Sequence, residues 1–426
     1  MRQSIIIAIV VSMQLISQLL MQLLVIRLIG IGPQTDAYIA AQGVPTVLGA
    51  IIITALQSVW LPRMSVQLAD NNDWRRMQAV AQGQAFILSG GVLLVLGSLV
   101  QYWLPQIYPG LDGQQQQDAI LYSVLLIATA GFTTQTALLT VALRSRGRFV
   151  VSECVTLLGT VISLVAMFFA LPLYGLAAAA WIALARAIAV YLAQLHLAGW
   201  PALSLTGGWR CKETWGLMRP LLLGTSIYKT SPVVDRYWAS HASTGGMTLL
   251  NLAQTATVAL ATVLERAIGM PIVPSLSRLA AERKYAEIRK VYRVFLLRTG
   301  MAILLLALTV VLLEDIMVHL FSQIFSMTSA YASEFLLFFL LMFGHLFASV
   351  AGGVLVSVFY AFEDSRTPVF IGITGFFIGL VLKWIFFWKL SISGLAMATS
   401  IYFVLNIFMF IVALEKKISR LEKNEA

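Results

Sequence analysis

Long apolar runs separated by short clusters of basic residues are the feature that most restricts how this chain can fold. Charged residues make up only 11% of its 426 positions and hydrophobic residues 59%, whereas soluble domains are about 25% charged. A helix that crosses a bilayer needs about 20 mainly apolar residues, so a chain of this length and composition accommodates about twelve of them. The pattern indicates an all-α polytopic membrane protein. It excludes a soluble enzyme, a disordered chain and a nucleic-acid-binding protein.

The apolar runs between the charge clusters predict the individual spans. Their approximate bounds are 4–28, 36–60, 78–103, 119–143, 150–171, 175–198, 216–240, 246–270, 290–313, 333–361, 367–388 and 392–414. Only a few residues around Pro172 divide spans five and six, so that division has the weakest sequence signal.

Basic residues gather on one side of this predicted topology. The even-numbered loops and the termini carry Arg2; Arg63, Arg75 and Arg76; Arg144, Arg146 and Arg148; Arg210, Lys212 and Arg219; Arg278, Arg283, Lys284, Arg289, Lys290 and Arg293; Arg366; and Lys416, Lys417, Arg420 and Lys423. The opposite side has only Arg27, Arg236 and Lys389, all at span ends. Cytoplasmic loops carry the excess of Lys and Arg, which predicts that both termini are cytoplasmic.

Two inner loops share a pattern about half a chain apart. LPRMSVQLADNNDW begins at Leu61 and VPSLSRLAAERKYA at Val273, which aligns Pro62 with Pro274. We therefore predict a parallel pseudo-repeat of two six-helix lobes around a central cavity, with the binding site near the midplane between the lobes. The N-terminal lobe would span 1–200, a cytoplasmic linker 201–219, the C-terminal lobe 220–415 and a cytoplasmic tail 416–426. Shared loop composition without a repeat is the alternative.

Motifs for catalysis, nucleotide binding or metal binding are absent from the sequence. The only two cysteines, Cys154 and Cys211, cannot form a CxxC pair. No GxSxG, HExxH or Walker A sequence occurs. We expect a protein that is not an enzyme and has no cofactor or metal, and whose transport draws on an ion gradient, the membrane potential or a downstream sink.

Polar side chains inside the predicted spans indicate a cavity wall, because a polar group in hydrocarbon is costly. Span eight carries such a row on one helix face, within an arc of about 80°: Asn251, Gln254, Thr255, Thr262 and Glu265. Rows in spans one and two contain Gln14, Ser17, Gln18 and Gln22, and Gln42, Thr46, Gly49 and Gln57. Amides and hydroxyls suit a sugar or peptide headgroup. Hydrogen bonding between helices is the alternative.

Lys229 is the most unusual single residue. It lies ten residues beyond the last basic residue of its inner loop, hence about 15 Å deep, near the midplane of a core about 30 Å thick. Arg236 projects from nearly the same face, and the two predict a cationic ladder for an anionic headgroup. Pro232 between them predicts a kink. Local neutralisation is the alternative: Asp235 and Glu265 are the carboxylates that could pair with the ladder or couple transport to an ion.

Three motifs resemble those of the MurJ (MviN) lipid II flippase family. IRLIGIGPQTDAY at 26–38 resembles the ARxFGAGxxTDAF signature, PSLS at 274–277 resembles LPSLS, and the stretch 359–368 resembles FYSRxDxxTP. The resemblance extends from about residue 10 to 414. It implies the fold of the MOP exporter superfamily, with spans 1, 2, 7 and 8 lining the cavity, and it carries Arg27 and Asp36 over as binding-site positions.

Other arginines of the family have no counterpart in this sequence. An ungapped match places Leu15 and Met21 at two arginines of the first helix, and Gly49 at the cavity arginine of the second. Ala253 and Gln254 stand at the Asp-Arg pair of the eighth helix. Twelve spans with fewer cavity arginines also fit Wzx-type flippases of undecaprenyl-linked polysaccharide units.

We therefore expect a flippase that moves an undecaprenyl-pyrophosphate-linked saccharide, lipid II or a related precursor, from the cytoplasmic to the outer leaflet of a bacterial inner membrane. Lys229 and Arg236 would contact the pyrophosphate. The expected sugar contacts are Asn251, Gln254, Gln18 and Gln42. Other expected partners are membrane lipids and Na+ or H+, and the chain would be a monomer. A Wzx-type flippase, a cation-coupled multidrug antiporter and a membrane glycosyltransferase are the alternatives.

Overall fold

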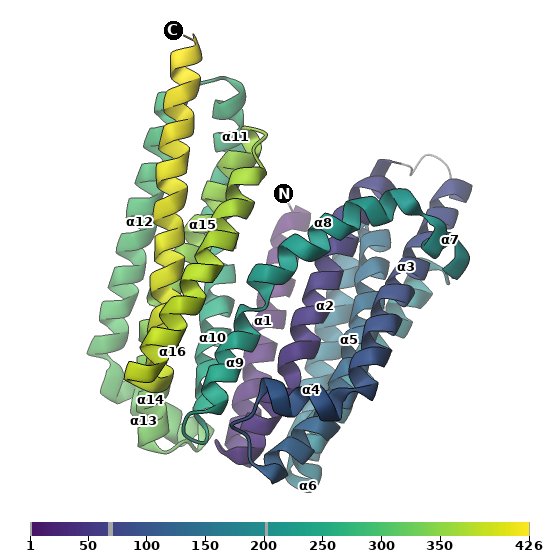
Figure 1. Cartoon of the computed structure of the whole chain (residues 1–426), viewed down its shortest axis with the longest axis vertical. Helices are drawn as coiled ribbons and strands as arrows, with labels where there is room; N and C mark the ends of the chain where they lie inside the picture. The colour runs from purple at the N-terminus through teal and green to yellow at the C-terminus, as the bar shows by residue number, and fades with distance from the viewer. Residues whose placement is uncertain (1, 67–70, 201–202, 426) are drawn as a thin grey trace. The chain divides into compact units, whose positions relative to one another are not determined.

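The structure is a computed structural model that describes residues 2–66, 71–200 and 203–425 (Figure 1). All regular elements in these ranges are helices. Nine helical stretches of the described residues are long and apolar enough to cross a membrane, and two of these join neighbouring elements. The α-helices are α1 Arg2–Ile29, α2 Pro33–Val66, α3 Asn71–Ser98, α4 Val100–Ile107, α5 Gly113–Ser145, α6 Phe149–Ala198, α7 Leu205–Arg210, α8 Lys212–Lys229, α9 Ser231–Ser240, α10 Gly246–Leu264, α11 Val273–Ala281, α12 Tyr285–Leu312, α13 Glu314–Phe325, α14 Ser329–Leu341, α15 Phe343–Ala361 and α16 Arg366–Glu425. A π-helical turn, η2 Glu265–Gly269, and a 3-10 turn, η3 Met270–Ile272, join α10 to α11. The predicted all-α fold class is confirmed.

The chain divides into two compact units, Met1–Met247 and Thr248–Ala426. Helices α8 and α9 pack on α2 within the first unit. The predicted lobes 1–200 and 220–415 differ from these units in where residues 220–247 belong, and they stay a prediction. Of the aligned loop segments, Pro62 lies inside α2 and Pro274 lies in the first turn of α11. The positions 67–70 of that alignment lie outside the described residues.

Helix α6 is a hairpin of two spans. Gly175 has a φ of 59° and a ψ of −154°, a conformation that glycine adopts without steric cost. The Gln194 amide lies 3.3 Å from the Ser152 hydroxyl, although 42 residues of straight helix would separate them by about 63 Å. The chain therefore reverses at Gly175, where the sequence predicted the weakly marked division between spans five and six.

Helix α16 reverses in the same way. Ser391 has a φ of 53° and a ψ of −132°, and beyond it the Tyr402 ring lies 5.4 Å from the Lys383 ammonium. A side chain at Gly375 would overlap Asn406 of the returning half. When each half of α6 and α16 counts as one span, the described helices are consistent with the predicted number of about twelve.

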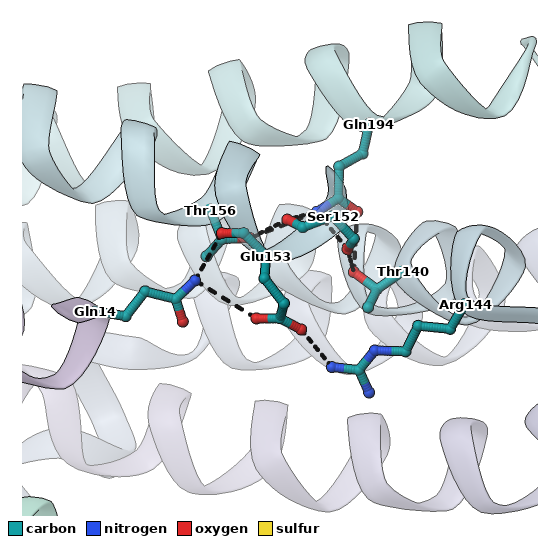
Figure 2. A network of polar contacts seen from close by, with 7 residues as sticks. All are labelled: Gln14, Thr140, Arg144, Ser152, Glu153, Thr156 and Gln194. Atoms are coloured by element: carbon teal, nitrogen blue, oxygen red, sulfur yellow. Dashed lines mark hydrogen bonds and ion pairs between the residues drawn. The ribbon is translucent and has the colours of Figure 1, made fainter. Parts of the chain in front are cut away.

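A polar network joins α1, α5 and the two halves of α6 (Figure 2). Gln14 of α1 donates to the backbone carbonyl of Glu153 at 2.8 Å, and the Glu153 carboxylate pairs with Arg144 at 2.6 Å. Gln194 accepts from Thr140 at 2.9 Å. Gln14 therefore joins helices, as the alternative interpretation of the span-one polar row predicted.

A second polar cluster joins the ends of α12 and α16 in the second unit. Arg289 reaches Glu415 and Glu422, both at 2.8 Å, and Arg293 reaches Glu415 at 2.6 Å. Figure 1 shows α12 beside the last part of α16. These contacts hold the helical C-terminal segment, the predicted tail at 416–426, against α12 as far as it is described.

Candidate substrate-binding residues

Lys229, the last residue of α8, contacts only neutral oxygen atoms. Its half-buried ammonium donates to the Ala50 carbonyl at 3.1 Å and to the Thr54 hydroxyl at 2.5 Å. Thr54 in turn donates to the Ala50 carbonyl at 2.7 Å. No carboxylate of the described residues lies within 4 Å of the Lys229 ammonium. Its positive charge is hydrogen-bonded and has no counter-ion there, so it can attract an anion.

Arg236 of α9 occupies space that Gly43 of α2 leaves open. A β-carbon at Gly43 would lie 3.1 Å from Nη1 of Arg236 and would overlap the Tyr108 hydroxyl. Tyr108 is fully buried at the end of α4. The guanidinium thus lies against the α2 backbone, at a point where any larger residue would displace it.

The two cations follow one helix register. From Lys229 to Arg236 the chain advances seven residues, and their neighbours on α2, Ala50 and Gly43, lie seven residues apart in the opposite direction. Antiparallel packing therefore places the cations about 10 Å apart along α2. A break at Thr230 separates α8 from α9, and Pro232 lies in the first turn of α9, so the predicted kink is observed.

The two aspartates of the predicted site are buried in the first unit. Asp36, in the first turn of α2, accepts a hydrogen bond from the Gly245 backbone amide at 2.6 Å. Asp36 is 5% exposed and Asp235 of α9 is 3% exposed. The Asp36 contact joins the start of α2 to the segment that precedes α10.

The signature stretch around Asp36 forms a tight turn between α1 and α2. Gly30 has a φ of 92°, which favours glycine, and Pro33 begins α2, where its missing N–H costs nothing. The Gly32 amide donates to the Thr35 hydroxyl at 2.9 Å, and that hydroxyl contacts the Gly32 carbonyl at 2.9 Å. This geometry accounts for most of the motif that carries the family resemblance.

The other predicted residues of the first unit lie apart from the cationic ladder. Arg27 and Gln18 are exposed on α1, which packs chiefly on α6. Gln42 is half-buried on α2 and hydrogen-bonds with Tyr38 one turn earlier. The structure thus groups Lys229 and Arg236 along α2, with Gln42 next to Gly43 in the chain.

The predicted residues of span eight lie in the second unit. Asn251 is 8% exposed and Gln254 is half-buried on α10. Thr255 and Thr262 donate to carbonyls of their own helix, at 2.9 and 2.8 Å. Their hydroxyl hydrogens are therefore not available to a ligand. Glu265 begins the π-helical turn η2, and a β-carbon at Gly353 of α15 would lie 2.5 Å from its carboxylate.

Sequence reasoning missed Gly43, Thr54 and Tyr108, which position the ladder. The sequence could have indicated these residues only if the packing register of α2 against α8 and α9 had been known. No group of three or more His, Cys, Asp or Glu residues within the described ranges could hold a metal ion. Cys154 and Cys211 are both free thiols.

Comparisons with known proteins agree with this fold. A solved structure of the lipid II flippase MurJ in an inward closed conformation matches with a TM-score of 0.84 and 15% identity, over 99% of this chain and 90% of that one. An inward-facing multidrug resistance MATE family transporter of the MOP superfamily matches with 0.78 and 16%, over 98% and 100%. A MOP superfamily transporter from Pyrococcus furiosus matches with 0.61 and 17%, over 98% and 95%.

The structural matches establish the fold, and the match to a sequence family establishes which family the chain belongs to. A comparison with curated proteins finds no match. The family described as lipid II flippase MurJ matches residues 25–425, nearly the whole sequence. The chain is therefore a multi-pass membrane protein that belongs to the MurJ lipid II flippase family.

Proposed function

We propose that this protein moves an undecaprenyl-pyrophosphate-linked saccharide from the cytoplasmic to the outer leaflet of a bacterial inner membrane, with both termini in the cytoplasm. The observation that carries the proposal is the Lys229 ammonium, which contacts only the Ala50 carbonyl and the Thr54 hydroxyl. A cation deep in a bilayer is costly and marks function by default. A pyrophosphate would supply the counter-charge.

Arg236 extends this positive surface along α2, from Ala50 beside Lys229 to Gly43 beside Arg236. The phosphates would contact the two cations in turn as the headgroup advances, while the polyprenyl chain stays in the bilayer. The predicted polar contacts Asn251, Gln254, Gln18 and Gln42, together with Arg27 and Asp36, remain proposals for the saccharide. Asp235 and Glu265 remain proposals for Na+ or H+ coupling.

The membrane potential supplies a driving force without a nucleotide. A potential that is positive outside favours the outward movement of an anion by about 2.3 kcal/mol per charge and per 100 mV. Rocking of two lobes would then alternate the access of the site. Transport should therefore increase with the imposed potential.

A Wzx-type polysaccharide-unit flippase is the second candidate, and Gly49 favours it. This residue stands where the family has a cavity arginine, and it is buried with its β-carbon position 3.6 Å from Ala130 of α5. This protein therefore has no cationic side chain at the position of that cavity arginine. The proposal therefore assigns the pyrophosphate to Lys229 and leaves the saccharide to be identified by transport of defined lipid-linked sugars.

The experiment is a flippase assay in proteoliposomes with fluorescent lipid II and, separately, a lipid-linked oligosaccharide. Lys229→Gln should lower the initial rate by about 10- to 100-fold, because a hydrogen bond to a charged group contributes about 1.5–3 kcal/mol. Lys229→Arg keeps the charge and should retain most of the rate. Lys389→Gln, which removes an exposed lysine at a span end, is the matched control.

A Lys229→Gln protein that inserts normally and transports at the wild-type rate would refute the role of the ladder. Transport of the oligosaccharide but not of lipid II would favour the Wzx-type candidate. A wild-type protein that transports neither, but exchanges a cationic dye for Na+ or H+, would replace the proposal by the antiporter.

A further inference from the structure

A groove of about 630 Å³ lies in the second unit between α12 and the η2–η3 segment. Most of its wall is apolar and includes Ile268, Ile272 and Phe295. Two cations, Lys290 and Arg298, line it from the α12 side. An apolar wall with positive charge on one edge matches the two parts of a membrane lipid.

The charges of α12 are divided between two of its faces. Arg289 and Arg293 are ion-paired with Glu415 of α16. Lys290 and Arg298 are both exposed, and neither has a carboxylate within 4 Å among the described residues. At 100° per residue they lie about 80° apart, on a different face from the paired arginines. The groove therefore carries two positive charges that no acidic residue of the described chain neutralises.

Thr299 adds a polar group to the groove floor. Its side chain lines the cavity and is 1% exposed. Its hydroxyl has no hydrogen-bond partner among the described residues, whereas eleven other threonines donate to the carbonyl four residues earlier. A buried hydroxyl without a partner costs free energy, and a ligand acceptor in the groove would recover it.

We propose that this groove binds a diacyl phospholipid with an anionic headgroup. The phosphate contacts Lys290 and Arg298, whose side chain extends toward the N-terminal end of α12 as helical side chains do. An ester carbonyl below the phosphate accepts the Thr299 hydroxyl, and the acyl chain covers Ile272 and Phe295. A polyprenyl pyrophosphate carries no ester carbonyl, so Thr299 favours a glycerolipid as the occupant.

The test is lipid retention by the purified full chain, measured by native mass spectrometry after titration with phosphatidylglycerol, phosphatidylcholine or undecaprenyl phosphate. Each cation near an anionic lipid contributes about fivefold in affinity. The double variant Lys290→Gln/Arg298→Gln should therefore lose about 30-fold in phosphatidylglycerol affinity. It should lose much less in phosphatidylcholine affinity, because the choline cation offsets the charge of that lipid's phosphate. Thr299→Val should lower the affinity for phosphatidylglycerol and for phosphatidylcholine by the same factor, because both lipids carry the ester carbonyl. Lys389→Gln/Lys423→Gln, which removes two exposed lysines outside the groove, is the charge-matched control.

Lys290→Arg/Arg298→Lys keeps both charges and should retain the preference for phosphatidylglycerol, which tests the charges in a second variant. Loss of preference in this variant would overturn the proposal. So would equal phosphatidylglycerol affinity of the double glutamine variant and the wild type, or stronger retention of undecaprenyl phosphate that depends on Lys290 and Arg298. Flippase activity is read separately with Lys229→Gln, so failure of one proposal leaves the other measurable.

Discussion

Asp364, in the turn between α15 and α16, gives the most direct test of the energetics. Its carboxylate accepts from the Lys417 ammonium at 2.8 Å, from the Thr367 hydroxyl at 2.8 Å and from the Thr367 amide at 3.0 Å. Burial raises the pKa of this carboxyl, but these hydrogen bonds outweigh it and lower the pKa from 3.8 to about 2. The charged carboxylate therefore stabilises the folded protein.

The magnitude follows from that difference in pKa. A carboxyl group with a folded pKa near 2 and an unfolded pKa near 3.8 contributes about 2 kcal/mol to the free energy of unfolding at neutral pH. Because the folded pKa is the lower one, this contribution is complete above about pH 4. It declines as the pH falls through about 2. The carboxyl is 18% exposed, so solvent screening reduces the figure only modestly.

The assay compares wild type with Asp364→Asn by SDS titration in mixed micelles, at pH 7 and at pH 2. The variant should lose about 2 kcal/mol at pH 7, and less than about 0.5 kcal/mol at pH 2. Glu363→Gln is the control, because this neighbouring carboxylate is exposed and should change stability by less than about 0.5 kcal/mol. A difference between wild type and Asp364→Asn that is the same at both pH values would refute the reasoning.

Three further substitutions test the two hairpins, each by the same SDS titration. Gly175→Ala should destabilise by about 1–3 kcal/mol, because the turn needs a conformation that alanine avoids; a neutral result would contradict the reversal at this residue. Ser391→Gly should stabilise by about 1 kcal/mol, because it relieves strain in the equivalent turn, and a loss of stability would argue against that strain. Gln194→Leu should cost about 2–3 kcal/mol, because it removes the acceptor of the Thr140 hydroxyl and the donor to Ser152. Gln101→Leu is the control, because Gln101 is exposed on α4, and equal losses in both variants would argue against the network.

The sequence was sufficient to predict most of the fold, because the bilayer restricts the options. Apolar runs alone placed spans such as α5 and α12, and the proline at 232 placed the break between α8 and α9. The turn residue Ser391 itself carries no signal, since serine rarely adopts a positive φ. Lys389 nevertheless marks the end of the preceding span, so the sequence separated spans eleven and twelve more clearly than spans five and six.

The candidate site was only partly predictable. A lysine far from any surface stands out in a sequence, so Lys229 was found. The contact of Gln14 with α6 was not predictable, because a helix wheel cannot distinguish a glutamine that faces a neighbouring helix from one that faces water. Gly43 carries no chemical signal at all, and its role emerges only from the position of Arg236 across the helix contact.

The two one-residue turns at Gly175 and Ser391 limit how the topology can be mapped. Neither turn offers a loop in which an epitope or a protease site could be inserted without unwinding the adjoining helices. Tyr174 and Trp388, each 71% exposed, flank these turns, and such aromatic residues prefer the depth of the lipid headgroups. We therefore expect each reversal to lie in the headgroup layer, where labelling of a single introduced cysteine would report the sidedness that inserted tags cannot.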